Sequence, residues 1–76
     1  MRYRLDLLLR PIEGALLRTI GLAERRGFAP LAIEGAPVDG QWRLQLIVDG
    51  TRSPETLQRL MEKNYDCLAV EITPCP

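Results

Sequence analysis

The sequence contains no histidine and only two cysteines, Cys67 and Cys75, among its 76 residues. Histidine nitrogen and cysteine sulfur are the usual ligands of protein-bound zinc, and histidine is the commonest general acid or base near neutral pH. No serine or cysteine stands beside an evident activating partner. The chain is therefore expected to have no catalytic residue and no metal site, and Cys67 is expected to be a small, at least half-buried apolar residue.

Excess charge and long hydrophobic runs are also missing. Ten Lys and Arg residues balance ten Asp and Glu residues, so the formal net charge is zero. Partners such as nucleic acid or an anionic membrane select for a basic excess, and neither is expected here. No stretch approaches the ~18 apolar residues that a membrane span requires. Asp6 and Arg10 interrupt the first leucine run, which is too short for a signal peptide. These features predict a soluble, cytoplasmic protein.

The length of the chain limits its hydrophobic core. A domain of this size buries only roughly 60% of the surface that its unfolded chain exposes. The 76 residues therefore predict a single domain whose stability benefits from contact with a partner surface.

The spacing of apolar residues changes along the chain between a period of two and a helical period. Tyr3, Leu5 and Leu7 alternate with charged residues as in a half-buried strand, whereas Leu16, Leu17, Ile20 and Ala23 recur at helical spacing. Gly27 occupies the position of a helix C-cap residue, and Ser53-Pro54 begins a second helix. The predicted elements are a strand over 2–9, a helix over 14–26, strands over 31–35 and 41–49, a helix over 54–63 and a strand over 67–73.

This β-α-β-β-α-β order predicts an α+β, ferredoxin-like domain, with a four-stranded antiparallel sheet and two helices on one of its faces. Strands 2–9 and 41–49 have the most regular alternation and are expected at the centre of the sheet. Pro30, Gly35 and Pro74 place the other two strands at its edges. An RNA-binding sheet would expose aromatic residues on its open face. Here the alternation turns Tyr3 and Trp42 toward the helices instead.

The first predicted helix and its end carry a family resemblance. The matching residues are Gly14-Ala15-Leu16, Arg18, Ile20-Gly21-Leu22 and Arg25-Arg26-Gly27-Phe28, followed later in the chain by Arg52-Ser53, Lys63 and Asp66. In this pattern the sequence resembles ACT domains, and in particular the regulatory small subunit of acetolactate synthase in its short form of one ACT domain. The resemblance covers nearly the whole chain.

The resemblance implies a non-catalytic regulatory and activating subunit that forms a homodimer and binds a catalytic large subunit of acetolactate synthase, in branched-chain amino acid biosynthesis. Thiamine diphosphate, Mg and FAD would belong to that partner, with no cofactor on this chain. An effector cleft would lie between the 10–14 loop of one protomer and the 29–34 strand of the other. Its candidate residues are Pro11, Ile12, Glu13, Gly14, Ala15, Ala29 and Pro30.

Two departures from the family affect the expected ligand. Amino-acid-binding relatives usually carry Asn or Asp in the loop before the helical glycine, and valine-sensitive subunits have an asparagine directly after the Arg-Gly-aromatic. This chain has Pro11-Ile12-Glu13 in the loop and Ala29-Pro30 after Phe28. Each missing hydrogen bond to a desolvated ligand group costs about 1–3 kcal/mol. We therefore expect no feedback inhibition by valine.

Two surfaces compete for the partner interface. The open face of the sheet is expected to present Leu8, Arg43, Ile47, Cys67 and Ala69, and the first helix offers Arg18, Arg25 and Arg26. Two other functions remain open at this point. One is a stand-alone ACT module that senses another small ligand at its dimer interface, and the other is a ferredoxin-like interaction domain with no metabolic role.

Overall fold

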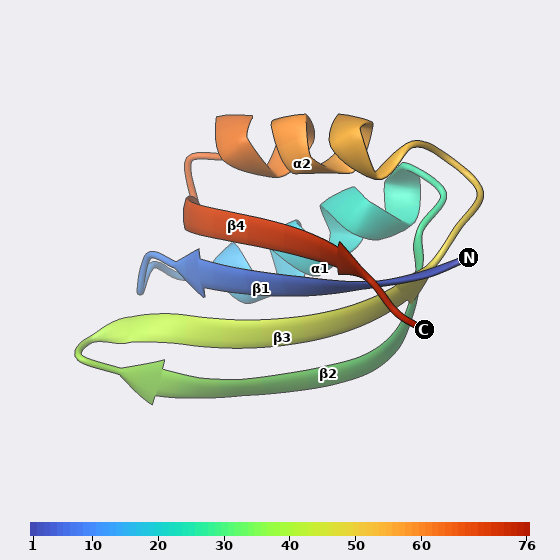
Figure 1. Ribbon diagram of the computed structural model, residues 1–76. Helices are drawn as coiled ribbons and strands as arrows, with labels where there is room; N and C mark the ends of the chain where they lie inside the picture. The colour runs from blue at the N-terminus through green and yellow to red at the C-terminus, as the bar shows by residue number, and fades with distance from the viewer.

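The computed structural model describes residues 1–76. Its elements are β1 (Arg2–Leu9), α1 (Ala15–Arg25), β2 (Ala29–Val38), β3 (Gln41–Asp49), α2 (Pro54–Lys63) and β4 (Cys67–Pro74). The four strands form one antiparallel sheet in the order β2-β3-β1-β4, and both helices cover the same face of it (Figure 1). The ferredoxin-like prediction is confirmed, and β1 and β3 are the central strands, as predicted. Neither helix is long and apolar enough to cross a membrane.

The core lies between the two central strands and the helices. Alternate residues of β1 and β3 are buried because they face the helix layer, which gives the strands their period of two. The buried apolar residues are Tyr3, Leu5, Leu7, Leu9, Ala15, Ala23, Phe28, Leu44, Leu46, Val48, Leu57 and Met61. The rings of Tyr3 and Phe28 meet edge to face, with centroids 6.2 Å apart. This core fixes the position of α1, whose two ends bound the candidate site.

The buried line of α1 differs from the predicted one. Ala15, Thr19 and Ala23 are the buried residues of the helix, whereas Leu17, predicted to widen the apolar stripe, has 76% of its surface exposed. Small side chains at positions i, i+4 and i+8 let the helix lie close to the sheet. Burial of Thr19 is possible because its hydroxyl oxygen accepts a hydrogen bond from the Asn64 amide (3.2 Å).

The C-terminal end of α1 is as predicted. Gly27 has φ 89°, a left-handed conformation that favours glycine. The Gly27 N–H donates to the Glu24 carbonyl (3.0 Å) and the Phe28 N–H donates to the Ala23 carbonyl (3.0 Å). This pair of bonds is the Schellman arrangement, and it directs Phe28 into the core.

Strand β2 is longer than the predicted 31–35. It covers Ala29–Val38 because β3 supplies a continuous pairing partner along its whole length, although its prolines and small residues have little strand propensity of their own. The register shifts between Pro30 and Ala32. The strand ends in a turn where Asp39 and Gly40 both have positive φ, as a tight Asp-Gly hairpin requires.

The two ends of the chain lie at the same end of the molecule (Figure 1). The Cys75 N–H donates to the carbonyl of Arg2 (2.9 Å), and the Gly50 N–H donates to the carbonyl of Met1 (3.0 Å). The backbone beside the C-terminus is therefore held against the start of β1.

Candidate functional site at the start of α1

Gly14 begins α1 in a left-handed conformation, with φ 79°. A Cβ atom at this position would lie 2.6 Å from Nη1 of Arg18, one helical turn further on. Glycine is favoured here for two reasons. It adopts a backbone conformation that other residues rarely adopt, and its lack of a side chain leaves space for the Arg18 guanidinium above the start of the helix. In this chain the space left by the missing side chain is filled by Arg18 of the same helix.

The guanidinium of Arg18 is held in place by Asp66. Nε of Arg18 lies 2.8 Å from Oδ2 of Asp66, and Nη2 lies 2.9 Å from Oδ1. The Asp66 side chain is only 6% exposed, whereas that of Arg18 is half exposed. Hydrogen bonding to Arg18 lowers the pKa of the Asp66 carboxyl group, which keeps it ionised. This two-bond ion pair joins α1 to the turn between α2 and β4.

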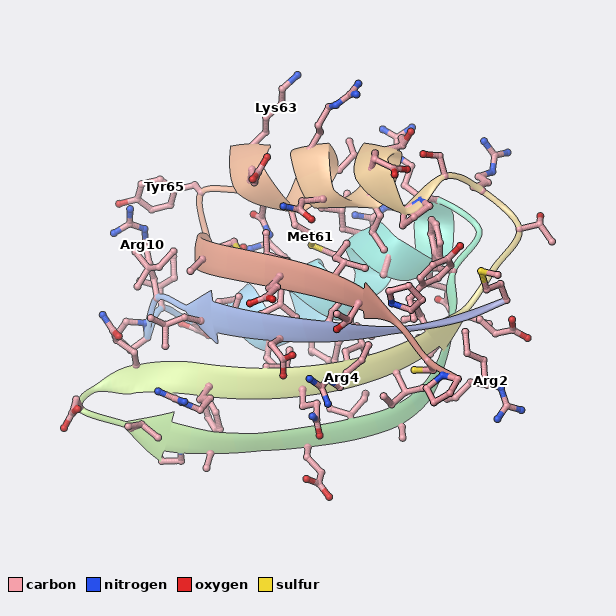
Figure 2. All side chains as sticks on the ribbon, in the orientation of Figure 1. Arg2, Arg4, Arg10, Met61, Lys63 and Tyr65 are labelled. Carbon is pink, nitrogen blue, oxygen red and sulfur yellow. The ribbon has the colours of Figure 1, made fainter.

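Arg10 fastens the same turn from the end of β1. Its backbone N–H donates to the Asp66 carbonyl (2.8 Å), and its Nε donates to the Tyr65 carbonyl (2.8 Å). The guanidinium also lies over the Tyr65 ring, 4.5 Å from its centroid, and the two side chains are adjacent in Figure 2. The 64–66 turn is therefore bound to both ends of the loop that precedes α1.

The predicted effector residues fall into two groups that one chain does not bring together. The loop residues Pro11, Ile12 and Glu13 are exposed at the start of α1, and the Ala15 N–H donates to the Ile12 carbonyl (3.1 Å). Ala29 and Pro30 follow the other end of this 11-residue helix, roughly 16 Å away at 1.5 Å per residue. A cleft that includes both groups requires a second copy of the chain.

An apolar surface lies beside α1, along the edge strand β2. The helices leave the edge strand β2 uncovered, so that Leu31 and Ile33 are 50% and 46% exposed. On α1, Arg18 points toward the 64–66 turn, and Leu17 and Ile20 lie on the opposite side, which is the side of β2. We call Leu17, Ile20, Leu31 and Ile33 the β2–α1 surface.

The predicted partner interface lies on the open face of the sheet, with one correction. Leu8, Arg43, Ile47 and Ala69 alternate with buried residues and are on that face. Cys67 is not, because the register of β4 shifts between Leu8 and Leu9 and turns Cys67 toward the core, where it packs. Burial raises the pKa of its thiol.

The polar residues of the open face include one exposed ion pair and form no metal site. Asp6 and Glu71 are opposite each other on β1 and β4, and Nε of Arg4 lies 3.1 Å from Oδ2 of Asp6. This ion pair is exposed to solvent and lies within one strand. No group of three or more His, Cys, Asp or Glu residues is arranged to hold a metal ion.

Comparison with protein families identifies the fold. A family model described as "ACT domain" matches residues 11–70, which include α1, the loop before it and the 64–66 turn. The chain belongs to the ACT domain family. ACT domains are regulatory domains. A search of curated protein sequences finds no match.

Solved structures of ACT domains and related proteins superimpose on nearly the whole chain. The ACT domain of a GTP pyrophosphokinase from Chlorobium tepidum is 15% identical, with a TM-score of 0.78 over 96% of this chain and 97% of that one. An acetolactate synthase small subunit from Thermotoga maritima is 22% identical, with a TM-score of 0.77 over 97% of this chain and 47% of that one. The C-terminal domain of the MgtC protein from Mycobacterium tuberculosis is 17% identical, with a TM-score of 0.73 over 97% and 86%. At these identities the likeness shows the shared fold.

Proposed function

We propose that this ACT domain is a regulatory and activating subunit of a cytoplasmic acetolactate synthase, in the biosynthesis of branched-chain amino acids. The catalytic large subunit would carry thiamine diphosphate, Mg and FAD, and this chain would act by binding to it. The observation that supports the proposal is the pattern from Gly14 to Phe28, together with the structural likeness to an acetolactate synthase small subunit over 97% of the chain. The chain spans about half the length of that protein.

The β2–α1 surface supports a homodimer. It is apolar and continuous with an unpaired strand edge, and an edge of this kind pairs readily with a second copy across a two-fold axis. Glu34 is the only charged residue of β2. Such a dimer would bring the 10–14 loop of one copy toward the β2 strand of the other, which completes the effector cleft.

The contents of that cleft favour a subunit that valine does not inhibit. The loop offers no side-chain amide, and the guanidinium of Arg18 lies directly above Gly14, where an effector's carboxylate would have to approach the helix. Asp66 already supplies the carboxylate that Arg18 binds. A free amino acid would therefore meet a site whose cation is paired within the protein.

Reconstitution tests the proposal. Adding the chain to a purified acetolactate synthase large subunit should raise the rate of acetolactate formation, and valine at millimolar concentration should leave the raised rate unchanged. Isothermal titration of the chain alone with valine should show no saturable heat. An unchanged rate with the large subunit would refute the proposed function, and a valine dissociation constant in the low micromolar range would refute the proposed insensitivity.

The stand-alone ligand sensor stays as the second candidate, since the ACT fold is shared with the domain of a GTP pyrophosphokinase. The same calorimeter, used with a panel of amino acids, separates the two functions. A saturable heat with an amino acid other than valine, combined with no effect on the synthase, would favour the sensor.

A further inference from the structure

The open face of the sheet carries its side chains in rows that cross all four strands. The strand registers fix which residues are neighbours. Read from β2 to β4, the rows are Ala36, Arg43, Leu8 and Ala69, then Glu34, Gln45, Asp6 and Glu71, then Ala32, Ile47, Arg4 and Thr73, and last a partial row with Asp49 and Arg2. Figure 2 labels Arg2 and Arg4 on this face. The first two rows line a hollow of about 700 Å³.

The acidic row is poorly neutralised within one chain. Asp6 and Glu71 are directly opposite each other, a position in which like charges destabilise a sheet. Arg4 forms an ion pair with Asp6, and Oδ1 of Asp49 holds the Met1 ammonium (3.1 Å) while its Oδ2 has no cation partner in the chain. Glu71 and Glu34 have no cation within 4.0 Å, and Arg43 has no carboxylate within that distance. The face therefore holds unpaired charges of both signs.

The balance of charge on this face does not favour a strongly acidic or basic partner. Three arginines stand among four carboxylates, which nearly cancel, and the remaining positions are mostly aliphatic or small. A surface of mixed charge is matched best by another surface whose charges alternate with the same spacing. A second copy of the chain presents such a surface.

Two sheets can face each other through a two-fold axis in two simple ways. With the axis perpendicular to the strands and placed between the second and third rows, each strand faces itself in the opposite direction. Asp6 then faces Arg4 of the second copy, and Arg43 faces Asp49 of the second copy. Arg4 of the second copy also lies beside Glu71 and supplies the cation that this carboxylate lacks. No like charges face each other.

The other arrangement is opposed by the same charges. An axis parallel to the strands keeps each row over itself and places β2 over β4. Glu34 would then face Glu71 of the second copy, and the two-fold axis repeats this repulsion at the symmetry-related position. Arg2 would face Asp49 in this arrangement, which offsets part of the repulsion. The first orientation is favoured because only the second brings two carboxylates together.

We propose that the open face is an interface between two copies of this chain, related by a two-fold axis perpendicular to the strands, with Arg43 paired to Asp49 across it. Four strands spaced about 4.8 Å apart and about eight residues long span roughly 19 × 26 Å, so this face is smaller than the ~800 Å² per partner of a standard interface. The association is accordingly modest and depends on concentration. It uses the face opposite the helices and leaves the β2–α1 surface free.

Sedimentation of the full chain with matched charge changes tests the interface. Arg43→Asp places two acids opposite each other across the axis and should weaken this association at least tenfold, and Asp49→Arg should do the same. The combined variant exchanges the two charges and should restore association. An Ile33→Lys background removes the β2–α1 dimer, so that the open-face step is measured alone. Arg59→Asp on α2, also an exposed arginine, is the control and should change nothing.

Each sedimentation result either supports or contradicts the proposed interface. Loss in the single variants with recovery in the combined variant supports the proposal, as does a weaker association in high salt. The proposal is wrong if the Ile33→Lys chain, whose open face is unchanged, stays monomeric at hundreds of micromolar. It is also wrong if the combined variant does not recover self-association. If Arg43→Asp leaves self-association unchanged but abolishes binding to the synthase large subunit, the face belongs to the enzyme and the proposal is wrong. Failure here leaves the activation assay unaffected, because that assay does not depend on this interface.

Discussion

Replacing Gly21 with alanine should stabilise the chain and weaken its dimer at the same time. Gly21 lies in the middle of α1, where glycine costs about 1 kcal/mol relative to alanine. A Cβ atom there would meet only the end of the Arg25 side chain, with Nη1 at 3.0 Å and Cζ at 3.9 Å. Because this guanidinium is free to move, nearly all of the difference in helix propensity between glycine and alanine should appear as an increase in the free energy of unfolding. For a domain of this size, about 1 kcal/mol raises Tm by roughly 4–8 °C.

The same methyl group has the opposite effect on the proposed dimer. Gly21 follows Leu17 by one turn and lies on the outer side of α1, beside the β2–α1 surface, where an added methyl group limits how closely a second helix can approach. Urea denaturation at low micromolar concentration measures the first effect, and sedimentation equilibrium in the Arg43→Asp background measures the second.

Gly40→Ala is the matched control for the stability measurement. A Cβ atom at Gly40 would have no neighbour within 4 Å, yet the φ of 77° makes alanine unfavourable there by about 1 kcal/mol. The two changes add the same methyl group and should shift Tm in opposite directions. A lower Tm for Gly21→Ala would refute the reasoning, since it would mean that the chain packs against this glycine in a way the structure lacks.

Two further changes test the packing around the site. Gly50→Ala should lower the free energy of unfolding by about 1–3 kcal/mol in urea denaturation, because its methyl group would meet the Gly27 carbonyl oxygen at 2.9 Å and the Phe28 ring at 2.7 Å; an unchanged midpoint would contradict this packing. Acid should remove the contribution of Asp66, whose pKa in the folded state lies below the unfolded value of about 3.9. The stabilisation is present above the unfolded pKa and is lost as pH falls through the folded pKa, so that Asp66→Asn should flatten the decline of stability below pH ~4. An unchanged decline would contradict this prediction.

Alternation of apolar residues was sufficient to predict the central strands and the second helix. β1 and β3 each bury one face against the helices, so their sequences must repeat every two residues, and their predicted bounds match the structure. The bounds of α2 were also predicted, since Ser53-Pro54 and Asn64 mark its ends. Strand β2 was predicted too short because its extent depends on pairing with β3 rather than on its own residues.

Long-range contacts at the site could not be predicted in the same way. Arg18 and Asp66 are 48 positions apart, and nothing in the local sequence distinguishes this ion pair from two solvated charges. The buried line of α1 was misjudged because Thr19 counts as polar by composition, whereas Asn64 satisfies its hydroxyl group in the fold. Cys67 was assigned to the wrong face because a single register shift in β4 reverses the alternation.

Because the two ends of the chain lie close together, the order of the elements along the chain could be changed without changing their arrangement in space. Since the backbones at Arg2 and Cys75 are hydrogen-bonded to each other, a short linker could join residue 76 to residue 1 without stretching the sheet. New ends could then be opened in the exposed hairpin at Asp39 and Gly40. Such a circular permutant keeps every strand pair and both helices, but it begins synthesis with β3 and ends with β2, so that the edge strand of the proposed dimer becomes the last part of the chain to be made.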